Sequence, residues 1–203
     1  GFEVVLSTDM TIYHANSVTG LVESLVGVVP GGGGVKELLY RWREIKGNET
    51  EAAWATFMNV GYGNTAQSPL EAIELGMFRE GIDSFVMNRD RLLDAAIEAA
   101  QKLAENYQPT YRDNFIMPGR EIWQEMQAWL QKRHEQGYLT PHDVTTGTQI
   151  ARIVTGGDVD TGTVMNEDDL FALERKAFLT LAKTEQTRKR IQHMLSYGKP
   201  LRN

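Results

Sequence analysis

The feature that most constrains the fold of this chain is a run of four glycines, Gly31 to Gly34, directly after Pro30. Residues 35–42 follow with apolar side chains at helical spacing, so the sequence predicts a tight turn that leads into a helix. Because glycine has no side chain, the N–H groups at the start of such a helix are open to a ligand atom or to water. A tight turn with no ligand is the plainer interpretation.

Phosphate is a common ligand of glycine-rich helix starts, but neither of the known phosphate-binding patterns matches. A P-loop has Lys and then Ser or Thr directly after its last glycine, whereas Val35-Lys36-Glu37 follows Gly34 here. A dinucleotide fingerprint has a glycine where this chain has Lys36. The bare backbone is therefore better suited to bring another bound group, or a water, within hydrogen-bond reach.

Two glutamates in apolar surroundings are the candidates for chemistry near this turn. Glu23 lies just upstream of the glycines, and Glu3 lies 20 residues earlier in "GFEVVL". A helix and two strands in between would allow the two side chains to meet. Two carboxylates around one water can divide acid and base work if their surroundings hold them in different protonation states. An exposed Glu23 without a role is the alternative, and spacing alone does not decide between them.

Composition excludes several other classes of function. The 203 residues contain no cysteine, which excludes disulfides, zinc–thiolate sites and thiol catalysis. The formal net charge of −6 argues against nucleic acid as a partner. No stretch reaches the ~18 apolar residues of a membrane span. The four histidines are not at metal-ligand spacing, so we expect no metal, and no serine lies in a nucleophile elbow.

The hydrophobic pattern predicts a mixed first half and a wholly helical second half. Strands are expected in "MTIYHA", "NSVTGLV" and "GIDSFVM". Helices are expected over 33–45, 49–61 with a stop at Gly61, 68–78, 88–107, 120–136, 141–155, 166–183 and 185–197. Prolines and aromatic residues between 107 and 120 indicate a connector. The predicted division is therefore 1–107 and 108–203.

One long stretch resembles the catalytic segment of the crotonase superfamily, specifically that of the enoyl-CoA hydratases: "GFEVVLSTDMTIYHANSVTGLVESLVGVVPGGGGVKELL". The matching positions are Gly1, Glu3, Asp9, Glu23, Gly27, Pro30, Gly31, Gly33 and Gly34. The tail, "LERKAFLTLAKTEQTRKRIQHMLSYGKPLRN", is similar to the carboxyl end of bacterial proteins that join a 3-hydroxyacyl-CoA dehydrogenase to an enoyl-CoA hydratase. The presence of both glutamates is typical of hydratases, since many sibling enzymes keep one or neither.

The resemblance implies a fold and a set of roles. The fold is an α/β one: residues 1–107 would be the carboxyl-terminal, helix-rich part of a crotonase-like domain, and 108–203 an all-helical extension. Glu3 would activate the water that attacks a trans-2-enoyl-CoA, and Glu23 would deliver a proton to the α-carbon. The N–H of Gly31 would help to hold the water. Gly1, Pro30 and Gly32 would contribute to substrate binding.

The resemblance also implies partners. The family polarises the thioester oxygen with two backbone N–H groups, one far upstream of Glu3 and one in the residue before Gly1. We therefore expect a fragment of a longer cytoplasmic β-oxidation protein, inactive without the upstream part of its domain. Its substrate would be an acyl-CoA thioester, and it would form a homo-oligomer. This segment would hold no cofactor; NAD would serve a 3-hydroxyacyl-CoA dehydrogenase domain of the parent protein. The alternatives are a sibling enoyl-CoA isomerase, which usually lacks the first glutamate, and a non-catalytic assembly or docking segment.

Overall fold

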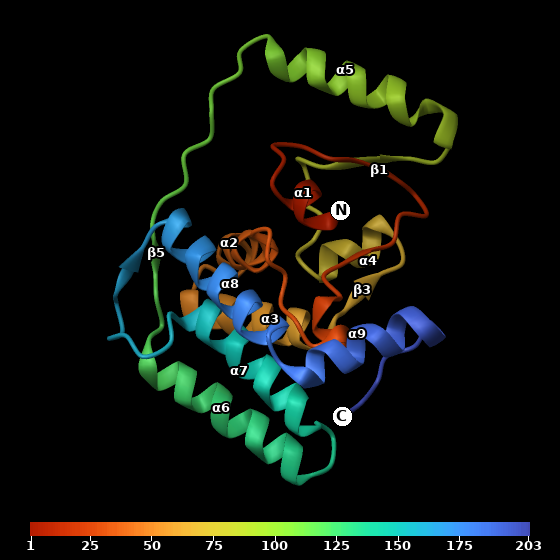
Figure 1. The fold of residues 1–203 in the computed structure, drawn as a ribbon. Coiled ribbons are helices and arrows are strands. Elements are labelled where there is room, and N and C mark those ends of the chain that lie inside the picture. The colour runs from red at the N-terminus through yellow and green to blue at the C-terminus, as the bar shows by residue number, and fades with distance from the viewer.

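Three helices form the centre of the molecule in the computed structural model, which describes residues 1–203. They are α2 (Gly34–Lys46), α3 (Glu49–Tyr62) and α7 (Pro141–Thr155), and α7 packs against the other two (Figure 1). The apolar spacing that predicts α2 places Val35, Leu38 and Leu39 in the core with no exposed surface. No helix is long and apolar enough to cross a membrane.

Side-chain caps explain where several helices begin. The side chain of Asn48 accepts the N–H of Glu51 at the start of α3, and Ser68 caps α4 (Pro69–Glu74). Thr140 begins α7 with a reciprocal capping box. The predicted stop of α3 at Gly61 is wrong: the helix continues to Tyr62, and the next glycine along the chain, Gly63, ends it at φ +61°.

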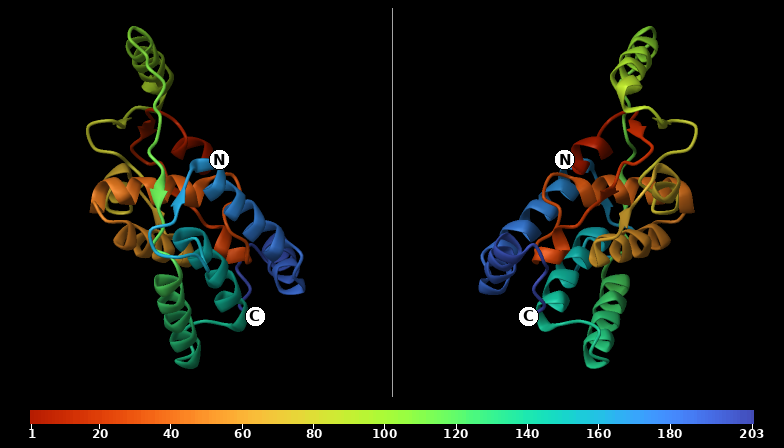
Figure 2. Two further views of the ribbon diagram at one scale, coloured as in Figure 1. Left: turned by 90° about the vertical axis from the view of Figure 1, so that its left-hand side faces the viewer. Right: turned by 90° about the vertical axis from the view of Figure 1, so that its right-hand side faces the viewer.

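The second half of the chain adds four of the long helices and one small strand pair. α6 (Arg120–Glu135) packs along α7, and α8 (Glu167–Ala182) and α9 (Glu185–Tyr197) run along the opposite side, as the rotated views show (Figure 2). This half is not wholly helical, because β5 (Phe115–Ile116) and β6 (Val164–Met165) pair antiparallel. Buried side chains from both sides of residue 107 share one core, and the division at that residue stays a prediction.

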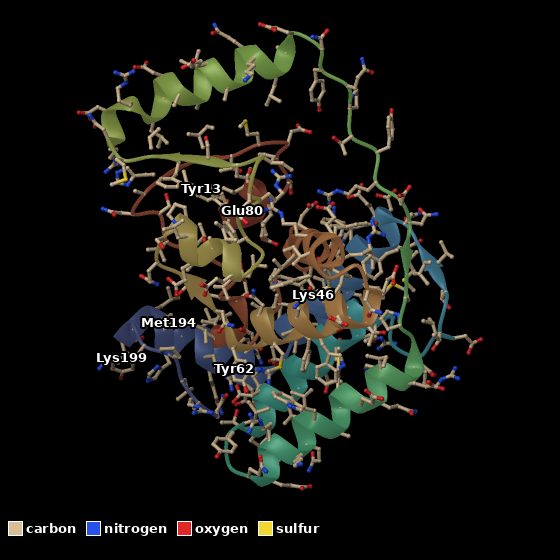
Figure 3. All side chains as sticks on the ribbon, turned by 180° about the vertical axis from the view of Figure 1, so that it is seen from behind. Tyr13, Lys46, Tyr62, Glu80, Met194 and Lys199 are labelled. Carbon is tan, nitrogen blue, oxygen red and sulfur yellow. The ribbon has the colours of Figure 1, made fainter.

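The first half also forms a projection away from the helical body. It contains the parallel pair β1 (Ile12–His14) and β4 (Ser84–Val86), and α5 (Leu92–Ala104), which has no buried residue. α1 (Phe2–Leu6) lies below it in Figure 1 and packs against α2. α5 stands apart from the body in Figure 1. Tyr13, labelled in Figure 3, lies at the base of the projection, where its hydroxyl donates to the Met77 carbonyl at 3.1 Å.

Several predicted elements are shorter than their patterns suggest. The helix predicted over 68–78 ends at Glu74. In place of one strand over "NSVTGLV", β2 (Thr19–Gly20) pairs antiparallel with β3 (Thr65–Ala66), and a 3-10 turn, η1 (Glu23–Val26), follows. The helix predicted over 88–107 is α5 preceded by a second 3-10 turn, η2 (Arg89–Arg91), which Asn88 caps. The chain therefore reaches Glu23 through a tight turn and not along a strand.

Candidate functional site at the start of helix α2

Glu3 binds the glycine tract directly. It lies in the first turn of α1, and the guanidinium of Arg41 fixes the end of that helix by donating to the Leu6 carbonyl at 3.0 Å. Oε1 of Glu3 accepts the N–H of Gly32 at 2.7 Å and that of Gly34 at 3.1 Å. Its other oxygen, Oε2, has no hydrogen bond within the chain and is not sealed from solvent. One oxygen therefore anchors the carboxylate to the helix start, and the other is free to accept a proton.

Glu174, which the sequence did not single out, binds the same helix start from the opposite side. It is fully buried on α8; Oε2 accepts the N–H of Gly33 at 3.0 Å, and Oε1 accepts the N–H of Lys36. Burial raises the pKa of Glu174 to about 8, and the charge of Glu3 adds to the rise, although the two N–H groups oppose it.

A signal for Glu174 exists in the sequence. It occupies one position of the stripe that α8 buries, in register with Leu170, Ala177 and Leu181. A glutamate among buried apolar residues requires a partner inside the protein. Its partners are backbone N–H groups, which cannot be recognised from residue types.

Glu23 lies in very different surroundings. It begins η1, is half-buried, and its Oε2 is enclosed without any hydrogen-bond partner. Burial raises the pKa of Glu23, and the negative charge of Glu3 raises it further. The two glutamates are therefore near enough to influence each other's charge, and Glu23 is the one that resists losing its proton.

The other residues predicted for the site are Gly31, Gly32, Pro30 and Gly1. Among the amides of the four glycines, that of Gly31 alone makes no hydrogen bond within the chain, whereas the amide of Gly32 is taken by Glu3. Pro30 is buried beside them. Gly1 is exposed before α1, and its carbonyl accepts the N–H groups of Val4 and Val5. The arrangement leaves one free N–H donor at Gly31 and one free carboxylate oxygen at Glu3.

The glycines are required by close approach as well as by backbone geometry. A Cβ on Gly32 would lie 3.0 Å from Glu3 Oε2, and one on Gly31 would lie 3.0 Å from the ring of Phe178. Gly33 has φ +97°, which a side chain would strain. Since two carboxylates of the chain itself already fill most of the helix start, the tract does not fit the pyrophosphate of a dinucleotide such as NAD.

Comparison with known proteins bears on the fold of the chain. No protein-family model matches the chain. The chain is similar in structure to a carnitinyl-CoA hydratase from Mycobacterium avium, with a TM-score of 0.56 over 99% of this chain and 57% of that one, at 16% identity. The fold is crotonase-like. The prediction of a helix-rich α/β fold of this class is therefore confirmed.

A second similarity comes from sequence. A protein of Bacillus subtilis (strain 168) described as a probable 3-hydroxyacyl-CoA dehydrogenase is 35% identical over the whole of this chain. The chain spans about a quarter, 26%, of the length of that relative. Both similar proteins are named for reactions of CoA thioesters.

Proposed function

We propose that this chain supplies the acid and the base of an enoyl-CoA hydratase that forms part of a longer protein. The observation that carries the proposal is the contrast in hydrogen bonding and burial between Glu3 and Glu23, whose charges interact, together with the free N–H of Gly31 in the tract that Glu3 binds. One carboxylate is held by N–H donors with an oxygen to spare, and the other is enclosed with a raised pKa. Two acids with separated proton affinities are what a reaction with one base and one acid requires.

The proposed reaction is addition of water across a carbon–carbon double bond. A water held by the Gly31 N–H gives a proton to Glu3 Oε2 while its oxygen bonds to C3 of a trans-2-enoyl thioester. The electron pair of the double bond moves to C2, which takes the proton of Glu23. The product is a 3-hydroxyacyl thioester; Glu3 is left protonated and Glu23 ionised, and exchange with solvent restores both.

The two similar proteins support this assignment. The structural neighbour is named a hydratase, and the Bacillus relative is named for a 3-hydroxyacyl-CoA, the class of product that hydration would yield. We infer that the parent protein joins hydration to the oxidation of its product. NAD would serve that oxidation in another part of the protein, because the glycine tract of this chain does not fit it.

The sibling reaction, isomerisation of an enoyl-CoA, is less well supported. Moving a double bond requires removal and return of a proton, which one carboxylate can do. Here a second carboxylate, Glu3, lies beside the glycine tract with a free oxygen. That second group suits the activation of water.

Kinetics of the full-length protein test the proposal. Hydration of a short trans-2-enoyl-CoA is followed by loss of the enoyl thioester absorbance. Glu3→Gln and Glu23→Gln should each lower kcat by about 10²- to 10⁴-fold, the usual contribution of a general acid or base. Glu44→Gln is the matched control, because Glu44 is exposed on α2 and makes no ion pair. If neither active-site variant slows hydration, the assignment is wrong and a role in assembly becomes the better explanation.

A further inference from the structure

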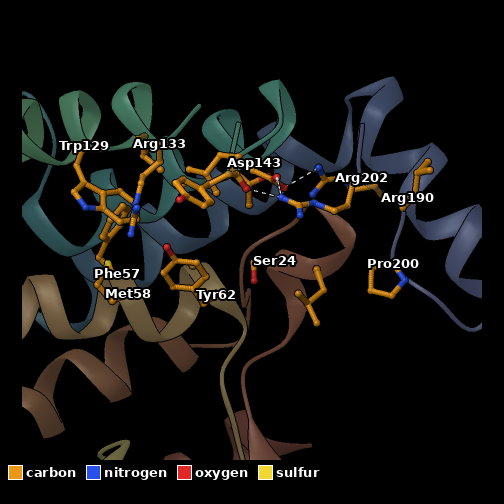
Figure 4. A pocket seen from close by; sticks show the side chains of 18 residues that line it. Ser24, Phe57, Met58, Tyr62, Trp129, Arg133, Asp143, Arg190, Pro200 and Arg202 are labelled. Atoms are coloured by element: carbon orange, nitrogen blue, oxygen red, sulfur yellow. Dashed lines mark hydrogen bonds and ion pairs between the residues drawn. The ribbon is translucent and has the colours of Figure 1, made fainter. Parts of the chain in front are cut away.

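A large cavity lies between η1, α3, α6, α7 and the end of the chain (Figure 4). Its volume is about 640 Å³, which is within the range of small-molecule sites. Its apolar wall includes Phe57, Trp129, Leu130 and Leu139. The rings of Phe57 and Trp129 meet edge to face at 5.7 Å, so this wall is a packed aromatic surface.

Three residues of the lining each hold an enclosed polar atom without a partner: the hydroxyl oxygens of Ser24 and Thr146 and the Nε of Arg133. Because these atoms are enclosed, they do not face the open space of the cavity. The terminal nitrogens of Arg133 are not enclosed and make no hydrogen bond within the chain. Arg133 therefore offers free N–H donors at the cavity.

Arg133 presents a positive charge that a ligand in the cavity would have to match with a negative one. Its guanidinium lies 5.3 Å from the ring centroid of Trp129 and 5.0 Å from that of Tyr138, and it makes no ion pair. The other two arginines of the lining, Arg190 and Arg202, both face the one acid there, Asp143, at 2.8 and 3.7 Å. Three arginines against one aspartate make the lining positive in a chain of net charge −6.

We propose that this cavity is a binding site for an amphipathic organic carboxylate. The carboxylate would pair with the terminal nitrogens of Arg133, whose planar fork suits two oxygens. The hydrocarbon body would lie against the aromatic wall. The site is separate from the glutamate pair, and the inference does not depend on the hydration reaction.

Calorimetric titration of the full-length protein with decanoate tests the site, with decanol as the uncharged probe. Decanoate should bind with one-to-one stoichiometry and more tightly than decanol. Arg133→Gln should weaken decanoate binding by about ten- to a hundredfold, the usual worth of a hydrogen bond to a charged group. Arg175→Gln, which removes an exposed arginine of α8 that makes no ion pair, should leave binding unchanged.

A second variant guards against misfolding of the first. Gly61 lines the cavity, and a Cβ placed on it would meet no atom within 4 Å. Gly61→Leu should therefore fill the cavity and abolish decanoate binding. Its free energy of unfolding should be no lower than that of the wild type, because leucine favours a helix more than glycine does. Absence of decanoate binding would overturn the proposal. Equal binding by decanol, or by Arg133→Gln, would also overturn it, since either result would remove the charge recognition.

Discussion

The start of α2 and the turn η1 hold the same residue type in opposite surroundings. At the start of α2, Glu3 accepts two N–H groups through one oxygen and keeps the other in reach of solvent. In η1, Glu23 has an enclosed oxygen with no donor and a raised pKa. Local donors and burial, and not the identity of the side chain, therefore give the two glutamates the different surroundings that the proposed base and the proposed acid require. Glu174 shows how strong burial can be: its two N–H donors do not offset complete burial, and its pKa is raised.

Apart from replacement of the two glutamates themselves, the largest expected effect comes from disturbing the contact between the glycine tract and Glu3. A Cβ on Gly34 would lie 2.9 Å from Leu21 and 3.0 Å from Glu3 Cγ, so Gly34→Ala must move the Leu21 side chain and crowds that of Glu3. We expect hydration by the full-length protein to fall about 10²-fold, the cost of a displacement of about 1 Å in a catalytic group.

Gly61→Ala is the control for that change, since it makes the same substitution in α3 with open space around the new methyl group. It should retain activity and stabilise the protein by up to about 1 kcal/mol through helix propensity. Steady-state kinetics and urea unfolding of both variants give the comparison. Full activity in Gly34→Ala would mean that the contact between Glu3 and the tract is not needed.

The next effect concerns the pH dependence of stability. Because burial raises the pKa of Glu174 from 4.5 to about 8, the folded protein holds a proton there that the unfolded chain releases. Its contribution to the free energy of unfolding is therefore present below about pH 4.5 and is lost as pH rises toward 8, by at most about 1.4 kcal/mol per pH unit. Glu174→Gln cannot titrate, so its stability relative to the wild type should rise across this window.

Urea unfolding at several pH values measures that difference, with Glu44→Gln as the variant that should follow the wild type. Parallel curves for Glu174→Gln and the wild type would show that Glu174 titrates normally in the folded protein. The claim that burial outweighs the two N–H donors would then be wrong.

The sequence predicts the helical body well because that body depends on local rules. Apolar spacing and a capping residue locate α7 and α9 to the residue, since both signals lie within the helix itself. The small strand pair β2–β3, which precedes Glu23, is predicted less well. β2 is two residues long, because its partner β3 comes from a distant part of the chain and pairs over only two positions.

The candidate site, like the fold, is predicted only in part from the sequence. Glu3 and Glu23 can be selected as candidates from their apolar neighbours and from the family resemblance. Their different surroundings depend on which backbone N–H groups point at each carboxylate, and a string of residues does not show this. The cavity is likewise built from several separate segments of the chain, so none of its unpaired atoms stands out in the sequence.

The most direct test of the central claim is a carboxyl-carbon NMR titration of Glu23 in the wild type and in Glu3→Gln. The account predicts that Glu23 titrates above the ordinary glutamate range, and that removing the charge of Glu3 lowers its pKa while Glu44→Gln does not. A Glu23 that titrates in the ordinary range, or that does not respond to Glu3→Gln, would contradict the claim that the two acids share one site with divided roles.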